Sequence, residues 1–159
     1  MLLKEALNKA SENEVIKSLT TNKGYLFTAV MSILSPSSYE VKQWILIYYN
    51  NNENKTIQAI IEEGKKIEVK SAEEPLKPSK QELQLSQIKT NSDKMIKKAV
   101  KEFQGYKKQL SQLIINLIQK ENHALWRFSF ITKTLEVITI EINAKTGEIT
   151  RKEKQKLVK

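Results

Sequence analysis

Apolar and polar residues alternate most regularly over residues 124–149. Every second residue of the segment 126–130 is aromatic, and every second residue of 138–142 is isoleucine, with polar or charged residues between them. An alternation with period two is typical of strands that bury one face. Gly147 supplies a turn residue near the end of the stretch. The pattern therefore predicts three strands in this part of the chain.

The first half of the chain has a related pattern. Residues 39–50 are rich in aromatic and β-branched side chains, an asparagine-rich turn follows, and residues 56–62 resume the same composition. Gly64 then precedes two apolar residues, Ile67 and Val69. We expect a β-hairpin here, followed by a short third strand.

Helical patterns precede the hairpin. Ser11 with Glu14 fits a capping box, which predicts a helix that starts there and includes Leu19, after a frayed helix over residues 3–10. Residues 25–34 are the second predicted helical segment. Their nearly continuous apolar character also fits a buried strand, and periodicity does not separate the two interpretations.

The second half begins with residues 83–88, whose loose alternation predicts a short strand. Ser92 and Asp93 are expected to cap a helix that runs to Phe103, with one apolar side and one basic side. A further amphipathic helix is expected over residues 110–118. The basic side of the first of these helices, called the lysine stripe below, consists of Lys94, Lys97, Lys98 and Lys101.

Four landmarks occur in the same order in both halves, at separations of 81 to 83 residues. They are Ser11 and Ser92, Gly24-Tyr25 and Gly105-Tyr106, Trp44 and Trp126, and Gly64 and Gly147. This order predicts an internal duplication. Residues 73–81, which are rich in proline and charge, are predicted to be a linker, so the expected domains are residues 1–72 and 82–159.

The second half resembles the PepSY family. Residues 85–99 contain the strand and serine-aspartate helix start typical of that family, and residues 138–149 contain its closing strand and turn. The closing turn motif corresponds to Asn143, Thr146, Gly147 and Glu148, with asparagine where the family more often has aspartate. The resemblance covers most of residues 83–150, and the first half matches only in outline.

This resemblance implies helices packed on an antiparallel sheet. Combined with the duplication, it leads us to expect an α+β protein of two similar repeats, each with helices on a three- to four-stranded antiparallel sheet. It also implies an accessory role, since PepSY modules occur in protease propeptides and in extracytoplasmic regulatory proteins.

The formal net charge of +9 is concentrated in the second half. Residues 1–80 hold 11 lysines and 10 acidic residues, a balance of +1, whereas residues 81–159 hold 16 basic and 8 acidic residues, a balance of +8. The lysine-rich residues 151–159 are expected to form a tail. Such an asymmetry attracts polyanions or acidic partners and affects encounter rather than fold, so the lysine stripe is a candidate surface for an anionic partner.

The residue types needed for catalysis or metal binding are sparse. Cysteine is absent and His123 is the one histidine, which excludes thiol chemistry and the common zinc sites. Glutamates that could form a pair lie at predicted strand edges and turns: Glu62, Glu63, Glu136, Glu141 and Glu148. The aromatic residues of the predicted strands are expected in the core: Trp44, Tyr48, Trp126, Phe128 and Phe130. We expect no catalytic, cofactor-binding or metal-binding residues.

These observations favour a non-enzymatic module that binds an unidentified protein or peptide partner through an open sheet surface or an edge strand, and that restrains a protease. The alternative is a basic module that binds nucleic acid or another polyanion through residues 82–159. The longest apolar run, residues 25–34, is about half of the roughly 20 residues that a membrane-spanning helix needs. As it stands the sequence predicts a cytoplasmic protein, or an extracytoplasmic one if a leader has been removed; it does not predict the oligomeric state.

Overall fold

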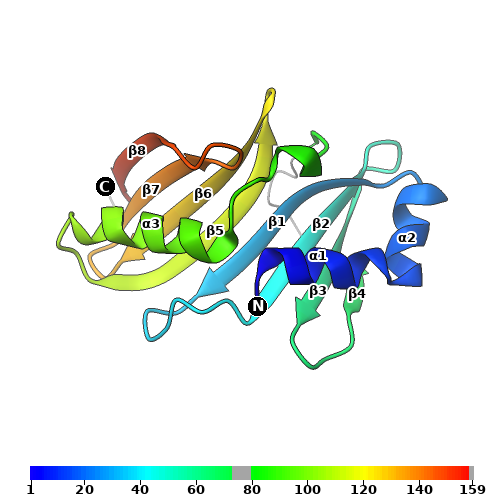
Figure 1. Ribbon diagram of the computed structural model, residues 1–159, viewed down its shortest axis with the longest axis horizontal. Helices are drawn as coiled ribbons and strands as arrows, with labels where there is room; N and C mark the ends of the chain where they lie inside the picture. The colour runs from blue at the N-terminus through cyan, green and yellow to red at the C-terminus, as the bar shows by residue number, and fades with distance from the viewer. Residues whose placement is uncertain (73–79, 158–159) are drawn as a thin grey trace.

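The computed structural model describes residues 1–72 and 80–157, and its helices lie in front of one curved sheet (Figure 1). The helices of this described part are α1 (Leu3–Ser11), α2 (Glu14–Thr21), α3 (Ser92–Gln104) and the short 3-10 helix η1 (Leu85–Gln87). The strands are β1 (Leu26–Leu34), β2 (Gln43–Asn50), β3 (Lys55–Glu62), β4 (Glu68–Ser71), β5 (Leu110–Lys120), β6 (His123–Thr132), β7 (Glu136–Asn143) and β8 (Ile149–Lys156).

The strands form a single antiparallel sheet with the order β4-β3-β2-β1-β5-β6-β7-β8. Its centre is the pairing of β1 with β5, which runs from Ala29 opposite Ile118 to Leu34 opposite Leu113. The expectation of two repeats, each with its own three- to four-stranded sheet, is wrong, because the β1–β5 hydrogen bonds join both halves into one eight-stranded sheet. The coarser expectation of an α+β protein with an antiparallel sheet is confirmed.

One hydrophobic core lies between the helices and one face of the sheet. In it, α1 contacts β3, and α3 contacts β6 and β7. The ring centroids of Trp44 on β2 and Trp126 on β6 lie 6.3 Å apart, and Phe103 of α3 stacks on Phe130 at 4.5 Å. The two halves therefore share one core. The aromatic residues expected in the core are all buried there: Trp44, Tyr48, Trp126, Phe128 and Phe130.

Two apolar segments with helical spacing are the central strands. The helices predicted over residues 110–118 and 25–34 are both wrong, since the first segment lies within β5 and the second largely within β1. The alternative interpretation of residues 25–34 as a buried strand is correct. In β5, Leu113, Ile115 and Leu117 are fully buried and the residues between them are partly exposed. The second face also carries apolar residues, among them Ile114 and Ile118, and this hides the period of two in the sequence.

Local hydrogen bonds also shift the predicted helix starts. The cap of α2 is Asn13, whose Oδ1 accepts a hydrogen bond from the backbone N of Ile16 at 3.0 Å. Ser11 is instead the last residue of α1, and its hydroxyl donates to the carbonyl of Asn8 at 2.7 Å. The predicted capping box at Ser11 is therefore wrong.

The cap of α3 is displaced by one residue from the prediction. Asn91 accepts from the backbone N of Lys94 at 3.1 Å, whereas Ser92 is the first helical residue. The Oγ of Ser92 accepts a hydrogen bond from the backbone N of Leu3 at 3.1 Å. This hydrogen bond joins the N-terminal ends of α1 and α3 across the two halves.

Two other predictions fail at the ends of the second half. The short strand predicted over residues 83–88 is a loop with the 3-10 helix η1 in it, although Leu83 is buried. The predicted basic tail is ordered as far as it is described, because residues 151–156 pair with β7 as the edge strand β8.

The landmarks of the predicted duplication can be located in both halves. Trp44 and Trp126 lie in the second strand of their half, and Gly64 and Gly147 lie between the third and fourth, with φ angles of 75° and 78°. The serines do not correspond, as shown above. The duplication stays a prediction, and residues 73–79 of the predicted linker lie outside the described residues.

Replacing Trp126 by Ala should lower the free energy of unfolding by roughly 3–5 kcal/mol, because it removes a large, fully buried side chain. The loss should appear as a shift of one cooperative urea transition seen by both far-UV circular dichroism and fluorescence, since both halves share the core. Replacing the exposed Val15 by Ala is the control and should change little. Two separated transitions would contradict the shared core.

Candidate functional site

The face of the sheet opposite the helices is covered by none of the described helices (Figure 1). Its centre is apolar and uncharged: β1 and β2 contain no charged residue, and β5 contains only Lys120, at its end. We call this centre the sheet face. Its partly or largely exposed apolar side chains are Met31, Ile33, Ile45, Ile47, Ile60, Ile114, Ile118, Ile131 and Val137.

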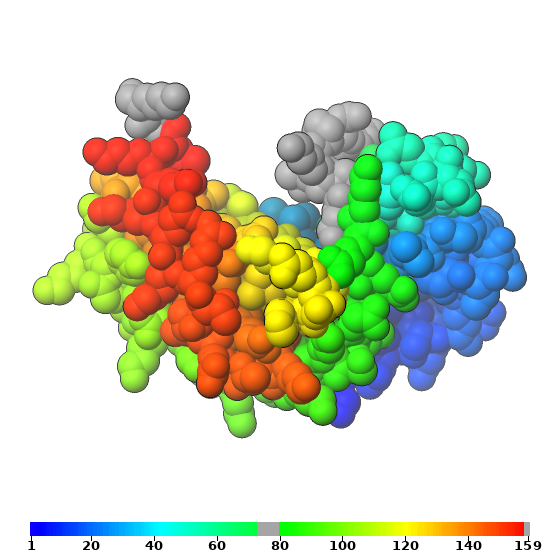
Figure 2. Space-filling model, turned by 90° about the horizontal axis from the view of Figure 1, so that it is seen from above, coloured from blue at the N-terminus to red at the C-terminus, as the bar shows by residue number. Residues whose placement is uncertain are grey.

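These side chains are neighbours across strands. Ile60, Ile45 and Met31 lie opposite one another on β3, β2 and β1, and Ile33 lies opposite Ile114 on β5. Met31 itself lies opposite the polar Asn116 of β5, so the apolar side chains of the two halves meet on this face at the pair of Ile33 and Ile114. Helices lie toward the lower side in Figure 2, and β8 is drawn red.

An ion-pair cluster lies beside the sheet face on β6, β7 and β8. Glu141 is 2% exposed and lies between the two arginines of the chain, Arg127 and Arg151. Arg127 donates its Nε to Glu141 at 2.7 Å, Arg151 approaches the other carboxylate oxygen at 3.5 Å, and Arg151 also pairs with Glu153. Because the buried carboxylate is matched by two guanidinium groups, its charge is compensated.

Arg127 keeps donors for a further contact. Its terminal guanidinium nitrogens make no hydrogen bond to a described residue, and its side chain is 33% exposed. A guanidinium held at one nitrogen presents its remaining donors in a fixed direction, which suits a carboxylate. Glu141, a candidate member of a carboxylate pair in the sequence, instead anchors Arg127; the sequence pattern does not reveal this role, because only the strand register places the two residues opposite each other.

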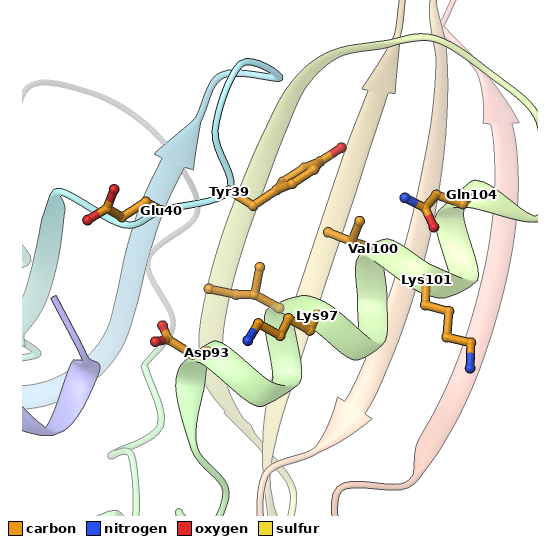
Figure 3. A pocket seen from close by; sticks show the side chains of 8 residues that line it. Tyr39, Glu40, Asp93, Lys97, Val100, Lys101 and Gln104 are labelled. Atoms are coloured by element: carbon orange, nitrogen blue, oxygen red, sulfur yellow. The ribbon is translucent and has the colours of Figure 1, made fainter.

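All four residues of the lysine stripe are exposed on α3. They are not equivalent, because Lys98 donates its Nζ to the carbonyl of Gly147. Lys97 and Lys101 line a pocket of about 410 Å³ between α3 and the β1–β2 connection (Figure 3). In that view Tyr39 and Val100 lie toward each other, whereas Lys101 points away from the tyrosine.

The charges of this pocket do not select a ligand. Asp93 and Glu40 line it together with Lys97 and Lys101, so positive and negative groups balance. A binding site for an anion should contain more hydrogen-bond donors and positive groups than carboxylates, as phosphate sites do. We therefore do not assign a ligand to the pocket.

The predicted turn motif stabilises the β7–β8 turn. Asn143 accepts hydrogen bonds through its Oδ1 from the backbone N atoms of Lys145 and Thr146 at 2.8 and 3.1 Å. The backbone N of Gly147 donates to the carbonyl of Asn143, and the Oγ1 of Thr146 accepts from the backbone N of Glu148 at 3.2 Å. These contacts are all within the turn, and they explain the motif without a ligand.

Replacing Gly147 by Ala should cost roughly 1–2 kcal/mol of stability, because a φ of 78° disfavours any side chain. The new Cβ would lie 3.6 Å from Met95 and Thr90, which is an ordinary contact, so the cost should come from the backbone. Gly64→Ala is the matched control: its φ is 75°, no atom lies within 4 Å, and it should cost about the same. A neutral Gly147→Ala in thermal melts would contradict this explanation.

A second ion-pair cluster, centred on Glu136, joins three segments of the second half. Glu136 is 6% exposed and accepts from Lys108 at 3.1 Å, and it also contacts Lys154 at 3.5 Å. Thr134 donates to the same carboxylate at 3.0 Å. The hydrogen bonds from Lys108 and Thr134 hold the pKa of Glu136 below its ordinary value of 4.5. The α3–β5 loop, the β6–β7 turn and β8 are thereby held together.

The pH dependence of the protein's stability follows from the lowered pKa of Glu136. A lowered pKa in the folded state stabilises the protein above about pH 4.5, and the contribution is lost as the pH falls through the folded-state pKa. The difference in melting temperature between the parent and Glu136→Gln should therefore shrink on acidification. Glu12→Gln, at an exposed carboxylate of the N-terminal half, is the control. A difference that does not vary with pH would contradict the assignment.

No described residues form a group of three or more histidine and carboxylate side chains placed to hold a metal ion. His123 is exposed at the start of β6, next to the β5–β6 turn. Within the part of the chain that the structure describes, no helix is long and apolar enough to cross a membrane.

Comparisons with known proteins identify the fold and not a family. No protein-family model matches the sequence, and no curated protein matches it. A crystal structure of a "putative lipoprotein" from Clostridium difficile 630 is similar, with a TM-score of 0.55 and 14% identity over 89% of this chain and 90% of that one. This likeness shows a shared fold. The resemblance to the PepSY family stays a prediction.

Proposed function

We propose that the protein is a non-enzymatic binding module whose sheet face binds a protein partner. The observation that carries the proposal is the group of exposed and partly exposed apolar side chains on β3, β2, β1 and β5, in which Ile60, Ile45 and Met31 lie opposite one another and Ile33 lies opposite Ile114. Such side chains gain free energy when they leave water, and contiguous exposed apolar surface is typical of interaction sites. A cofactor is not part of this proposal.

The chemistry of the sheet face favours a partner that presents apolar side chains with an acidic residue beside them. Arg127, beside the sheet face, would pair with a carboxylate on that partner.

Edge-strand pairing with a peptide has less support. The edge strand β4 has only four residues, and the other edge, β8, is rich in lysine, which is how proteins commonly prevent pairing at an edge. The sheet face therefore supports a folded partner better than an extended peptide. Restraint of a protease is the specific form of this function that the PepSY resemblance implies.

The location of the protein is part of the proposal. The structural neighbour is described as a "putative lipoprotein", and PepSY modules occur in extracytoplasmic regulatory proteins. Both support a location outside the cytoplasm. Polyanion binding through the lysine stripe has less support, because Lys98 is engaged by the β7–β8 turn and the adjacent pocket contains acidic residues.

The experiment uses the double variant Ile45→Thr with Ile114→Thr. Threonine keeps the β-branched shape, so the fold should persist, while both substitutions remove apolar surface from the sheet face. A partner captured from source cells by cross-linking would be purified, and its dissociation constant measured by calorimetry. We expect the double variant to weaken binding by about tenfold or more.

The matched control replaces two exposed apolar residues elsewhere, Val15 and Leu85, by Thr; they are 56% and 49% exposed. This variant should bind like the parent. If the sheet-face variant keeps the parental dissociation constant and melting temperature, the sheet face is not the binding surface.

A further inference from the structure

Leu135 adopts an unfavourable conformation in the β6–β7 turn. Its φ is 58°, in the left-handed region that disfavours residues other than glycine and asparagine. Its side chain is also 51% exposed, so it gains little from burial. The other residues with positive φ in the described chain, apart from glycines, are polar: Asn54, Lys107 and Glu121. Because Leu135 has a strained backbone and gains little from packing, its side chain is expected to have a role other than stabilising the fold.

A second exposed leucine lies beside it. The backbone N of Leu157 donates to the carbonyl of Leu135 at 2.8 Å, and Leu157 is 56% exposed. The α3–β5 loop adjoins the same turn, since the backbone N of Lys133 donates to the carbonyl of Gln109 at 2.9 Å. Figure 1 shows the end of α3 and the end of the chain at the same side of the molecule. We call this region the basic end.

The charge of the basic end is strongly positive. Its lysines are Lys107, Lys108, Lys133, Lys154 and Lys156, and Glu136 is the acidic residue among them, so the balance of five and one is +4. Glu136 contacts Lys108 and Lys154. Lys107, Lys133 and Lys156 make no ion pair with any described residue, and their side chains face solvent.

We propose that the basic end binds the surface of an anionic phospholipid bilayer, with its lysines at the headgroups and with Leu135 and Leu157 inserted at the interface. Lysines near an anionic surface gain from its negative potential. Exposed leucines gain only when they enter an apolar medium, which a bilayer supplies. The binding is peripheral and reversible, and it uses none of the residues of the sheet face.

The same residues suit nucleic acid less well. The basic end contains no arginine for bidentate contacts with bases or phosphates. Tyr106, the aromatic residue of the α3–β5 loop, packs against the core and offers no free ring for base stacking. The two leucines would also stay in water on a phosphate backbone. Lipid therefore accounts for both the charges and the leucines.

The experiment measures co-sedimentation of the full chain with vesicles of phosphatidylcholine alone or mixed with phosphatidylglycerol, at low and at moderate salt. We expect binding to the mixed vesicles that weakens with salt, and no binding to phosphatidylcholine alone. Lys107→Gln, Lys133→Gln and Lys156→Gln together should weaken it by about a hundredfold. The matched control, Lys4→Gln, Lys9→Gln and Lys23→Gln, removes the same charge from exposed lysines of the N-terminal half and should have a much smaller effect.

The leucines are tested by Leu135→Asn with Leu157→Asn. Asparagine tolerates the left-handed region, so the melting temperature should be unchanged or higher, while vesicle binding falls. Leu135→Gly is a second variant with the same expectation. Val15→Asn with Leu85→Asn, at similarly exposed positions, is the control and should bind like the parent.

Three results would overturn the proposal. The first is that the parent does not bind the mixed vesicles. The second is that the leucine variants bind the mixed vesicles as tightly as the parent, or that the control lysine variant loses as much vesicle affinity as the basic-end lysine variant. The third is that the basic-end variants lose binding to a DNA duplex but keep binding to vesicles, which would assign the region to nucleic acid.

Discussion

The pairing of β1 with β5 is the interaction on which the rest of the structure depends. Both strands carry apolar side chains on both faces, so as sheet edges they would expose long rows of unpaired backbone groups beside apolar side chains. Pairing them satisfies the backbone groups and brings β2 and β6 close enough for Trp44 and Trp126 to contact each other. The hydrogen bond between Leu3 and Ser92 then links the helices of the two halves above the same core.

This arrangement gives the two faces of the sheet different chemistry. One face is filled by α1 and α3, while the centre of the other is apolar, uncharged and free of described helices. The arginines stand beside that face around Glu141, and lysines gather on α3 and at the basic end. The two proposed partners, a protein on the sheet face and a lipid bilayer at the basic end, would therefore use different residues.

Two turns between strands each contain a residue with a left-handed backbone. Gly147 has a left-handed backbone and is a glycine, its neighbours complete the turn, and the structure alone explains the motif. Leu135 has a similar backbone but carries a large exposed side chain that nothing in the fold requires. Places where a residue violates a local preference without a packing gain are where function is expected.

The sequence by itself was enough to predict the helices and strands whose apolar residues recur with a single period and lie on one buried face. The strands around Trp44 and Trp126, the turns at Gly64 and Gly147, and the apolar side of α3 follow from alternation, from backbone freedom at glycine and from helical spacing. The net charge and its concentration in the second half are also properties of the sequence.

Only the tertiary structure decided the rest. Residues 25–34 and 110–118 carry apolar residues on both faces, so their period is ambiguous until β1 and β5 pair with each other. Whether the Nζ of Lys98 is available to an anionic partner depends on its hydrogen bond to the carbonyl of Gly147, a residue 49 positions away. The sheet face and the basic end are likewise assembled from segments distant in sequence, and a local pattern carries no information about which strands become neighbours.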